Sequence, residues 1–133
     1  MSFSSAQTAI ETYFKAQWGS TTQIEFENDA WNPDLYDEYV KFSIQFGEAV
    51  PMGLGNKAFR YFGVVFVQIF VRPAVGNARM LTLADTASGL FRTTLSVTGV
   101  KFLVPRITKF PNSAGGWVQT QLACNFYFEE LLP

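Results

Sequence analysis

Residues 39–46, YVKFSIQF, decide the fold, because they form the most regular strand pattern in this chain of 133 residues. Apolar and polar side chains alternate along the stretch: Val40, Phe42, Ile44 and Phe46 face one way, and Lys41, Ser43 and Gln45 face the other. A period of two residues is typical of a strand with one face on a core and the other toward solvent. The stretch therefore predicts a half-buried strand.

Four further strands are predicted around this one. Thr21–Glu27 repeats the alternation, and Arg60–Arg72 is apolar on both faces near its centre, which favours a central strand covered on each side. Val100–Ile107 predicts a strand that a proline interrupts, and Trp117–Glu130 predicts a long final strand. On that last strand Val118, Thr120, Leu122, Cys124, Phe126 and Phe128 share one face.

Two helices are predicted from apolar residues at helical spacing. The first begins at Ser4, which has a glutamine three residues later as in a capping box, and it ends at Gly19 as a C-cap. The second covers Gly76–Arg92, where apolar residues line one face. The expected core contains Phe42, Ile44, Val67, Ile69, Leu83, Ala87, Leu90, Leu122 and Phe126.

The order of these elements predicts an α+β fold. It runs α-β-β-β-α-β-β, and consecutive long strands favour a mainly antiparallel or mixed sheet with two helices packed on one face. Asn28–Asp37 is rich in turn-forming residues and predicts a loop. Gly47–Phe59 predicts either a long loop or a loosely paired hairpin tip, because proline and glycines interrupt it. Residues 1–133 are expected to form one domain.

The composition points to contacts with other protein chains or to an unusually aromatic core. Only 16% of the residues are charged, whereas 17% are aromatic, and depletion of charge with enrichment of rings is typical of protein interfaces. Both interpretations stay open. The net charge is −1 and no row of basic residues occurs, so the sequence does not predict binding to nucleic acid along a broad surface.

Residues that commonly carry catalysis or bind metals are scarce. The chain has no histidine, and its one cysteine, Cys124, cannot form an intramolecular disulfide and is expected to be a buried apolar residue. Gly53-Leu54-Gly55 lacks the lysine and the serine or threonine of a phosphate loop. The acidic residues Asp29, Asp34, Asp37 and Glu38 lack the spacing of a calcium loop. We therefore expect no enzyme, no cofactor and no metal site, and by elimination a role in binding or assembly.

The termini and the apolar runs do not predict export or a membrane span. Residues 1–5 lack the basic and apolar regions of a signal peptide. The longest apolar run, near Phe62–Val71, is about half the length that a bilayer requires. The expectation is a protein made and used in the cytosol, without a membrane partner.

Several short motifs recur in an order that resembles a known family. They are Ala30–Pro33 (AWNP), Tyr39–Phe42 (YVKF), the pattern RxxGxxxVxxFVxP over Arg60–Pro73, the helix segment Leu83–Arg92, Gly99–Phe102 (GVKF) and Gly116–Val118 (GWV). This arrangement resembles the tail terminator (tail completion) proteins of long-tailed bacteriophages and prophages, in particular the group related to the lambda tail terminator. The similarity extends over nearly the whole chain, and the order and spacing of the motifs carry it.

The resemblance implies a small α+β structural protein of the virion. In that family six copies form a ring on the head-proximal end of the tail tube, which stops tube polymerisation and provides the surface to which the filled head attaches. The implied partners are other copies of the chain, the tail tube protein and the head–tail connector or head completion protein, with assembly in the host cytoplasm. The family has no catalytic residues, so the resemblance assigns none here.

Two alternatives remain open from the sequence. Another neck protein, such as a head completion or head–tail joining ring, is also built from small α+β subunits. A carrier of a small apolar ligand would use the aromatic face of the sheet as a pocket and would be a monomer.

The segment Gly47–Arg60 is the candidate partner-binding surface. It contains more apolar residues than a solvated loop requires, and Lys57 and Arg60 at its end are its only positively charged residues. The candidate interface residues are Val50, Met52, Leu54, Lys57, Phe59 and Arg60. The alternative is a loop that folds back and packs these side chains within its own domain.

Overall fold

A computed structural model describes residues 2–26, 38–52, 58–72, 77–93, 96–97, 99–110 and 118–131. The elements in chain order are α1 (Phe3–Trp18), β1 (Gln23–Phe26), β2 (Glu38–Met52), β3 (Ala58–Val71), α2 (Asn77–Thr93), β4 (Ser96–Val97), β5 (Val100–Phe102), β6 (Arg106–Phe110) and β7 (Val118–Leu131). The predicted α+β order is confirmed. The strand expected over Val100–Ile107 is divided into β5 and β6, and the two-residue strand β4 was not predicted. The loop predicted over Asn28–Asp37 lies outside the described residues.

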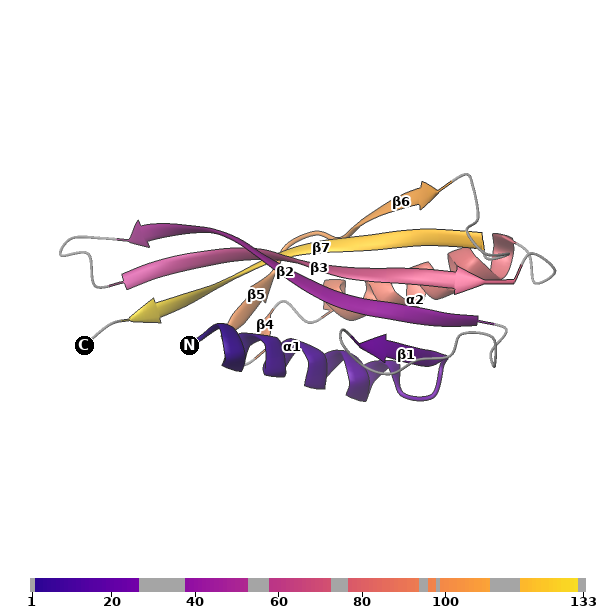
Figure 1. Cartoon of the computed structure of the whole chain (residues 1–133), viewed down its shortest axis with the longest axis horizontal. Helices are drawn as coiled ribbons and strands as arrows, with labels where there is room; N and C mark the ends of the chain where they lie inside the picture. Colours follow the sequence, from indigo (N-terminus) through magenta and orange to yellow (C-terminus); the bar gives the residue numbers. More distant parts are fainter. Residues whose placement is uncertain are drawn as a thin grey trace.

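The strands form one mixed sheet with the order β1-β2-β3-β7-β5-β4. β6 also pairs with β7, along residues 119–123, whereas β5 pairs with residues 126–127 of the same strand. β1 runs parallel to β2, and every other pair is antiparallel. Figure 1 shows α1 and α2 on the same side of the long strands, as predicted. We call the face toward the helices the inner face and the opposite one the outer face.

β3 is central in the sheet, between β2 and β7, as its apolar sequence predicted. Only its inner face is buried: Val65, Val67, Ile69 and Val71 have no exposed surface. The alternate residues, such as Val64 and Phe66, are only half-buried. The expectation of cover on both faces is therefore wrong, because both described helices pack on the same side.

The core lies between the helices and the inner face, and Phe14 of α1 is at its centre. Its ring stacks on those of Phe42, Trp18 and Phe91, at centroid distances of 4.7, 5.3 and 6.3 Å. Of the nine expected core residues, seven are buried, whereas Ile44 and Leu90 are only partly buried against the cluster. Offset stacking adds to the free energy gained by burying these rings.

The N-cap of the first helix lies two residues earlier than predicted. Its N-cap is Ser2, whose side chain accepts a hydrogen bond from the N–H of Ser5 at 3.1 Å, and the Ser5 hydroxyl accepts one from the N–H of Ser2 at 2.9 Å. This reciprocal pair is a capping box at Ser2, in place of the capping box predicted at Ser4. The earlier start brings the ring of Phe3 within 5.0 Å of Tyr61 on the sheet. Gly19 ends the helix with φ 59°, a conformation in which glycine is not strained.

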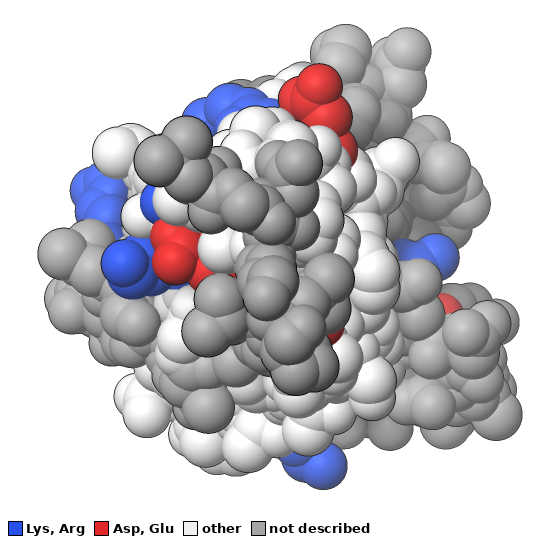
Figure 2. Space-filling model, turned by 90° about the vertical axis from the view of Figure 1, so that its left-hand side faces the viewer, with Lys and Arg blue, Asp and Glu red and all other residues white. Residues whose placement is uncertain are grey.

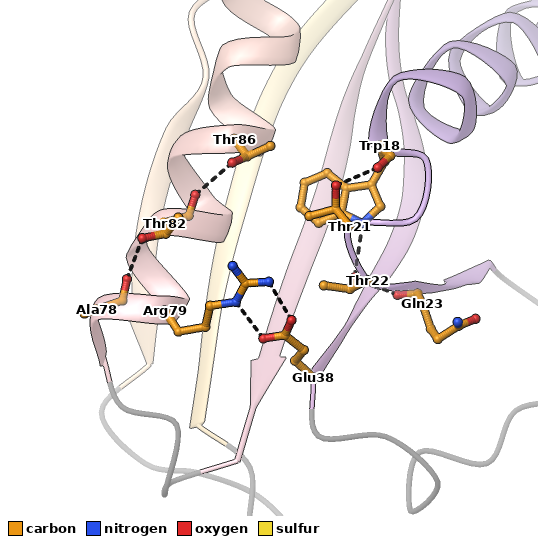
Figure 3. Close-up of polar contacts among 9 residues, drawn as sticks. All are labelled: Trp18, Thr21, Thr22, Gln23, Glu38, Ala78, Arg79, Thr82 and Thr86. Atoms are coloured by element: carbon orange, nitrogen blue, oxygen red, sulfur yellow. Dashed lines mark hydrogen bonds and ion pairs between the residues drawn. The ribbon is translucent and has the colours of Figure 1, made fainter.

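Polar contacts occur at the start of α2 and just after the end of α1 (Figure 3). Arg79 near the start of α2 donates two hydrogen bonds, of 2.8 and 2.6 Å, to the carboxylate of Glu38 at the start of β2. The indole N–H of Trp18 donates to the buried hydroxyl of Thr22 at 3.1 Å, just after α1. The ion pair therefore links the start of α2 to β2, and the indole bond stabilises the turn between α1 and β1.

Candidate partner-binding surface

The candidate surface is built on an extension of the sheet that we call the arm: residues 46–52 of β2, 58–63 of β3 and 126–131 of β7. Figure 1 shows these strands continuing past the start of α1 to the left. The prediction of a loop over Gly47–Phe59 is wrong for the described part, because β2 continues to Met52, which pairs with Ala58. The hairpin alternative is the correct one. β7 pairs with β3 as far as Ala58, so its ladder supports the hairpin from the other side.

A bulge in β2 decides which arm side chains lie on which face. Phe46 pairs with Gly63 and Ala49 pairs with Tyr61, so Gly47 and Glu48 together oppose a single residue of β3. Beyond the bulge Val50 pairs with Arg60, and directly paired residues share a face. Without the extra residue Val50 would point to the inner face, as Phe46 does. The bulge therefore places Val50 on the outer face.

The six predicted interface residues do not form one surface. Val50, Met52 and Arg60 lie on the outer face, and Phe59, paired with Pro51, lies on the inner face. Val50 is 41% exposed, whereas Met52, Phe59 and Arg60 are half-buried. Leu54 and Lys57 lie outside the described residues.

Arg60 is the centre of a cluster of charged and aromatic side chains on the outer face. Its guanidinium donates a hydrogen bond of 2.6 Å to Glu129 and lies 4.4 Å from the ring centroid of Tyr127. The ammonium of Lys101 lies 5.8 Å from the same ring, and the ring of Phe62 is 6.1 Å away from it. The hydrogen bond from Arg60 lowers the pKa of Glu129. The cluster thus combines an ion pair with cation–π contacts.

Sequence reasoning missed Lys101, Tyr127 and Glu129 as parts of this cluster. Each comes from a strand distant in sequence from Arg60, and only the pairing of Arg60 with Glu129 and of Lys101 with Tyr127 brings them together. The alternation of the final strand predicted that Glu129 faces away from the core. The alternation did not indicate which strands would pair with the final strand.

The inner side of the arm is anchored by aromatic rings. Phe3 at the start of α1 packs edge-on against Phe46 and Phe128, at centroid distances of 4.9 and 5.9 Å, and Tyr61 stacks on Phe128 at 5.2 Å. Phe3 is nevertheless 48% exposed. The base of the arm is therefore packed against α1, while apolar side chains remain accessible there and farther out.

The view onto the arm end shows charged side chains around its margin (Figure 2). Blue and red atoms adjoin at the top and on the left, and uncharged residues cover most of the described surface between the charged ones. Arginine and tyrosine are over-represented among residues that dominate binding energy, so the outer face of the arm has the chemistry of a protein contact.

A hollow of about 660 Å³ runs along α1 and is lined only by serine, threonine, alanine and tyrosine side chains. Within the described ranges, no three Asp, Glu or Cys side chains gather as metal ligands. Neither described helix is long and apolar enough to span a bilayer.

Comparison with known proteins defines the fold only. No protein-family model and no curated protein matches the sequence. A solved structure whose name states no function is similar to this chain, with a TM-score of 0.68 and 14% sequence identity, over 96% of this chain and 97% of the other. A structural similarity at this level of sequence identity shows a shared fold, and the function has to be inferred from the residues of this chain.

Proposed function

We propose that this protein forms a ring on the head-proximal end of a bacteriophage tail tube, where it ends tube polymerisation and provides the surface for head attachment. The motifs in Tyr39–Phe42, Arg60–Pro73 and Gly116–Val118 support the proposal by their resemblance to tail terminator proteins. The structural observation that supports it best is the arm, which carries the exposed Val50 beside Arg60 on a face that neither described helix covers.

An arm of this composition is best explained by a partner. Isolated exposed apolar side chains are common, but here exposed or half-exposed apolar residues follow one another along Ala49–Met52. Pro51 and the bulge at Gly47–Glu48 are features that discourage indiscriminate pairing of a strand edge. The combination favours contact with a specific partner over nonspecific aggregation.

The composition supports assembly more than catalysis. The chain has no histidine, and the thiol of Cys124 is buried on the inner face. In this proposal the protein is not an enzyme and has no cofactor. Its partners are further copies of itself, the tail tube protein and the head–tail connector or head completion protein, and it is built into the virion in the host cytoplasm.

Electron microscopy of particles that contain this chain tests the proposal directly. A tag or antibody on the protein should label the head-proximal end of the tail tube, and averaged images should show sixfold symmetry there. Label on a different layer of the neck would favour the head completion or head–tail joining alternative. Label elsewhere in the particle, or none, would exclude both.

A deletion tests the role of the arm in the same particles. Removing Pro51–Lys57 should leave a folded protein, because both helices and the core that they cover lie away from the hairpin end of β2 and β3 (Figure 1). Joined, infectious particles should then be lost. Thr8→Ala, on the exposed side of α1, serves as the control and should leave them unchanged. Normal infectivity after the deletion would contradict the assignment of the arm.

A further inference from the structure

The sheet has two open margins on opposite sides. On one side β1 pairs with β2 only from Tyr39 to Phe42, and no described strand pairs with that edge of β2 from Gln45 to Met52. On the other side β6 pairs with β7, and no described strand pairs with its second edge. We call Leu103–Ile107, at the start of β6, the β6 margin.

Exposed large apolar side chains gather at the β6 margin, and one lies at the opposite margin. Six large apolar residues among the described ones are at least 40% exposed, and three of them lie in the β6 margin: Leu103 at 45%, Val104 at 79% and Ile107 at 42%. Beside them is an apolar hollow of about 330 Å³, lined by Phe91, Arg92, Phe102, Leu103, Val104 and Pro105. A fourth exposed residue, Val50, lies on the arm at the opposite margin.

The two margins are complementary in charge. The arm contains three acidic residues, Glu48, Glu129 and Glu130, and one basic residue, Arg60, which is paired with Glu129. At the β6 margin Arg106 is exposed, and the exposed Arg92 lines the hollow. An acidic margin and a basic margin on one molecule attract each other between copies, whereas like margins repel.

The strand directions are also compatible. β2 is antiparallel to β3, β3 to β7 and β7 to β6, so β2 and β6 run in opposite directions. β6 lies level with residues 39–43 of β2, so one copy must be shifted along the strands to bring the arm opposite it. If the sheets then continue in the same sense, the arm of the first copy faces an antiparallel β6 of the second. Pro51 and the bulge limit backbone pairing there, so side chains of the arm must supply most of the contact.

We infer that the arm of one copy docks on the β6 margin of the next, with Val50 against Leu103 and Val104. The contact joins two different surfaces, and repeated contacts of that kind generate a ring when the rotation between copies closes. This inference specifies how the proposed ring is joined, and therefore rests on the proposed function.

Paired cysteines test the contact in the full-length protein. Val50→Cys and Val104→Cys are both at exposed positions, and the native Cys124 is buried. Oxidation of the double variant at increasing protein concentration should give a ladder of disulfide-linked oligomers. Each single variant alone should give none, because the contact does not bring two copies of the same residue together. Val50→Cys with Leu81→Cys is the matched control, since Leu81 is 40% exposed on α2, away from the margin.

A charge at the centre of the contact provides a second measurement. Val104→Asp should weaken self-association at least about tenfold in analytical ultracentrifugation, and Leu81→Asp should not. Equal cross-linking with Leu81→Cys, an unchanged association of Val104→Asp, or a protein that stays monomeric without any cross-link would each overturn the inference. Rings on tail tubes without the Val50–Val104 cross-link would overturn this contact alone, and cross-linked oligomers absent from tail ends would overturn the proposed function alone.

Discussion

The ring of Phe126 lies directly over Gly63, its cross-strand partner at the base of the arm. A β-carbon at position 63 would be 2.4 Å from Cζ of Phe126 and 2.9 Å from the carbonyl oxygen of Gln45. Glycine is unfavourable in the middle of a strand, so its presence here is explained by the ring that occupies the space. The same ring lies 6.0 Å from that of Phe46.

Gly63→Ala should therefore destabilise the protein by about 1–3 kcal/mol, the usual cost of overpacking a core. Urea unfolding followed by circular dichroism measures the change. Gly89→Ala is the control, because a β-carbon there meets no atom within 4 Å, and in a helix alanine is favoured over glycine. A cost for Gly63→Ala no greater than for Gly89→Ala would show that Phe126 does not occupy this place.

The ion pair of Glu38 and Arg79 should make stability depend on pH. The hydrogen bond from Arg79 is the main reason that the pKa of Glu38 is below its usual value of 4.5. Because the folded-state pKa is lowered, the stabilisation is complete above the unfolded value and is lost as pH falls through the folded one. Glu38→Gln should cost about 0.5–1 kcal/mol near neutral pH. The difference from the wild type should shrink as pH falls below about 4.3, the usual value for an unfolded glutamate, and a difference that does not depend on pH would contradict the pair.

The buried hydrogen bond between Trp18 and Thr22 should contribute to stability at the end of α1. Thr22→Val keeps the shape but leaves the indole N–H of Trp18 without its acceptor, which should cost about 1–3 kcal/mol. Thr21→Val is the matched control. It removes a hydroxyl that donates to the carbonyl of Trp18, but the N–H of residue 21 still donates to that carbonyl. Equal effects of the two substitutions in thermal unfolding would count against the buried bond.

The thiol of Cys124 should be unreactive in the folded protein. Burial raises its pKa to about 12, and its Sγ lies 3.3 Å from the carbonyl oxygen of Leu103, to which it donates. Because the thiolate is the reactive form, a thiol reagent at about pH 8 should not modify the native chain. Modification should become complete in denaturant. Fast reaction of the native protein would show that the β5–β6 segment opens readily.

The sequence by itself determined the elements and the inward-facing residues of the sheet. Alternation along residues 39–46 and 118–128 correctly predicted which side chains face the helices, and helical spacing placed Leu83 and Ala87 in the core. These patterns are local, because the period of two or of 3.6 residues depends on backbone geometry alone. The same reasoning failed at the start of the first helix, where Ser2 and Ser4 are both suitable N-cap residues. The structure uses Ser2, and with that cap Phe3 packs on the sheet.

The candidate surface was decided by tertiary structure. Proline and glycines in residues 47–57 predicted a loop or a loosely paired tip, but pairing with β3, supported by β7, continues β2 to Met52. One bulged residue then moved Val50 to the outer face, and strand pairing brought Tyr127 and Glu129 to Arg60. A register shift of one residue reverses every side chain beyond it, and it arises from contacts between strands far apart in sequence. Local patterns carry no record of such contacts, which is why the arm became visible only in the folded chain.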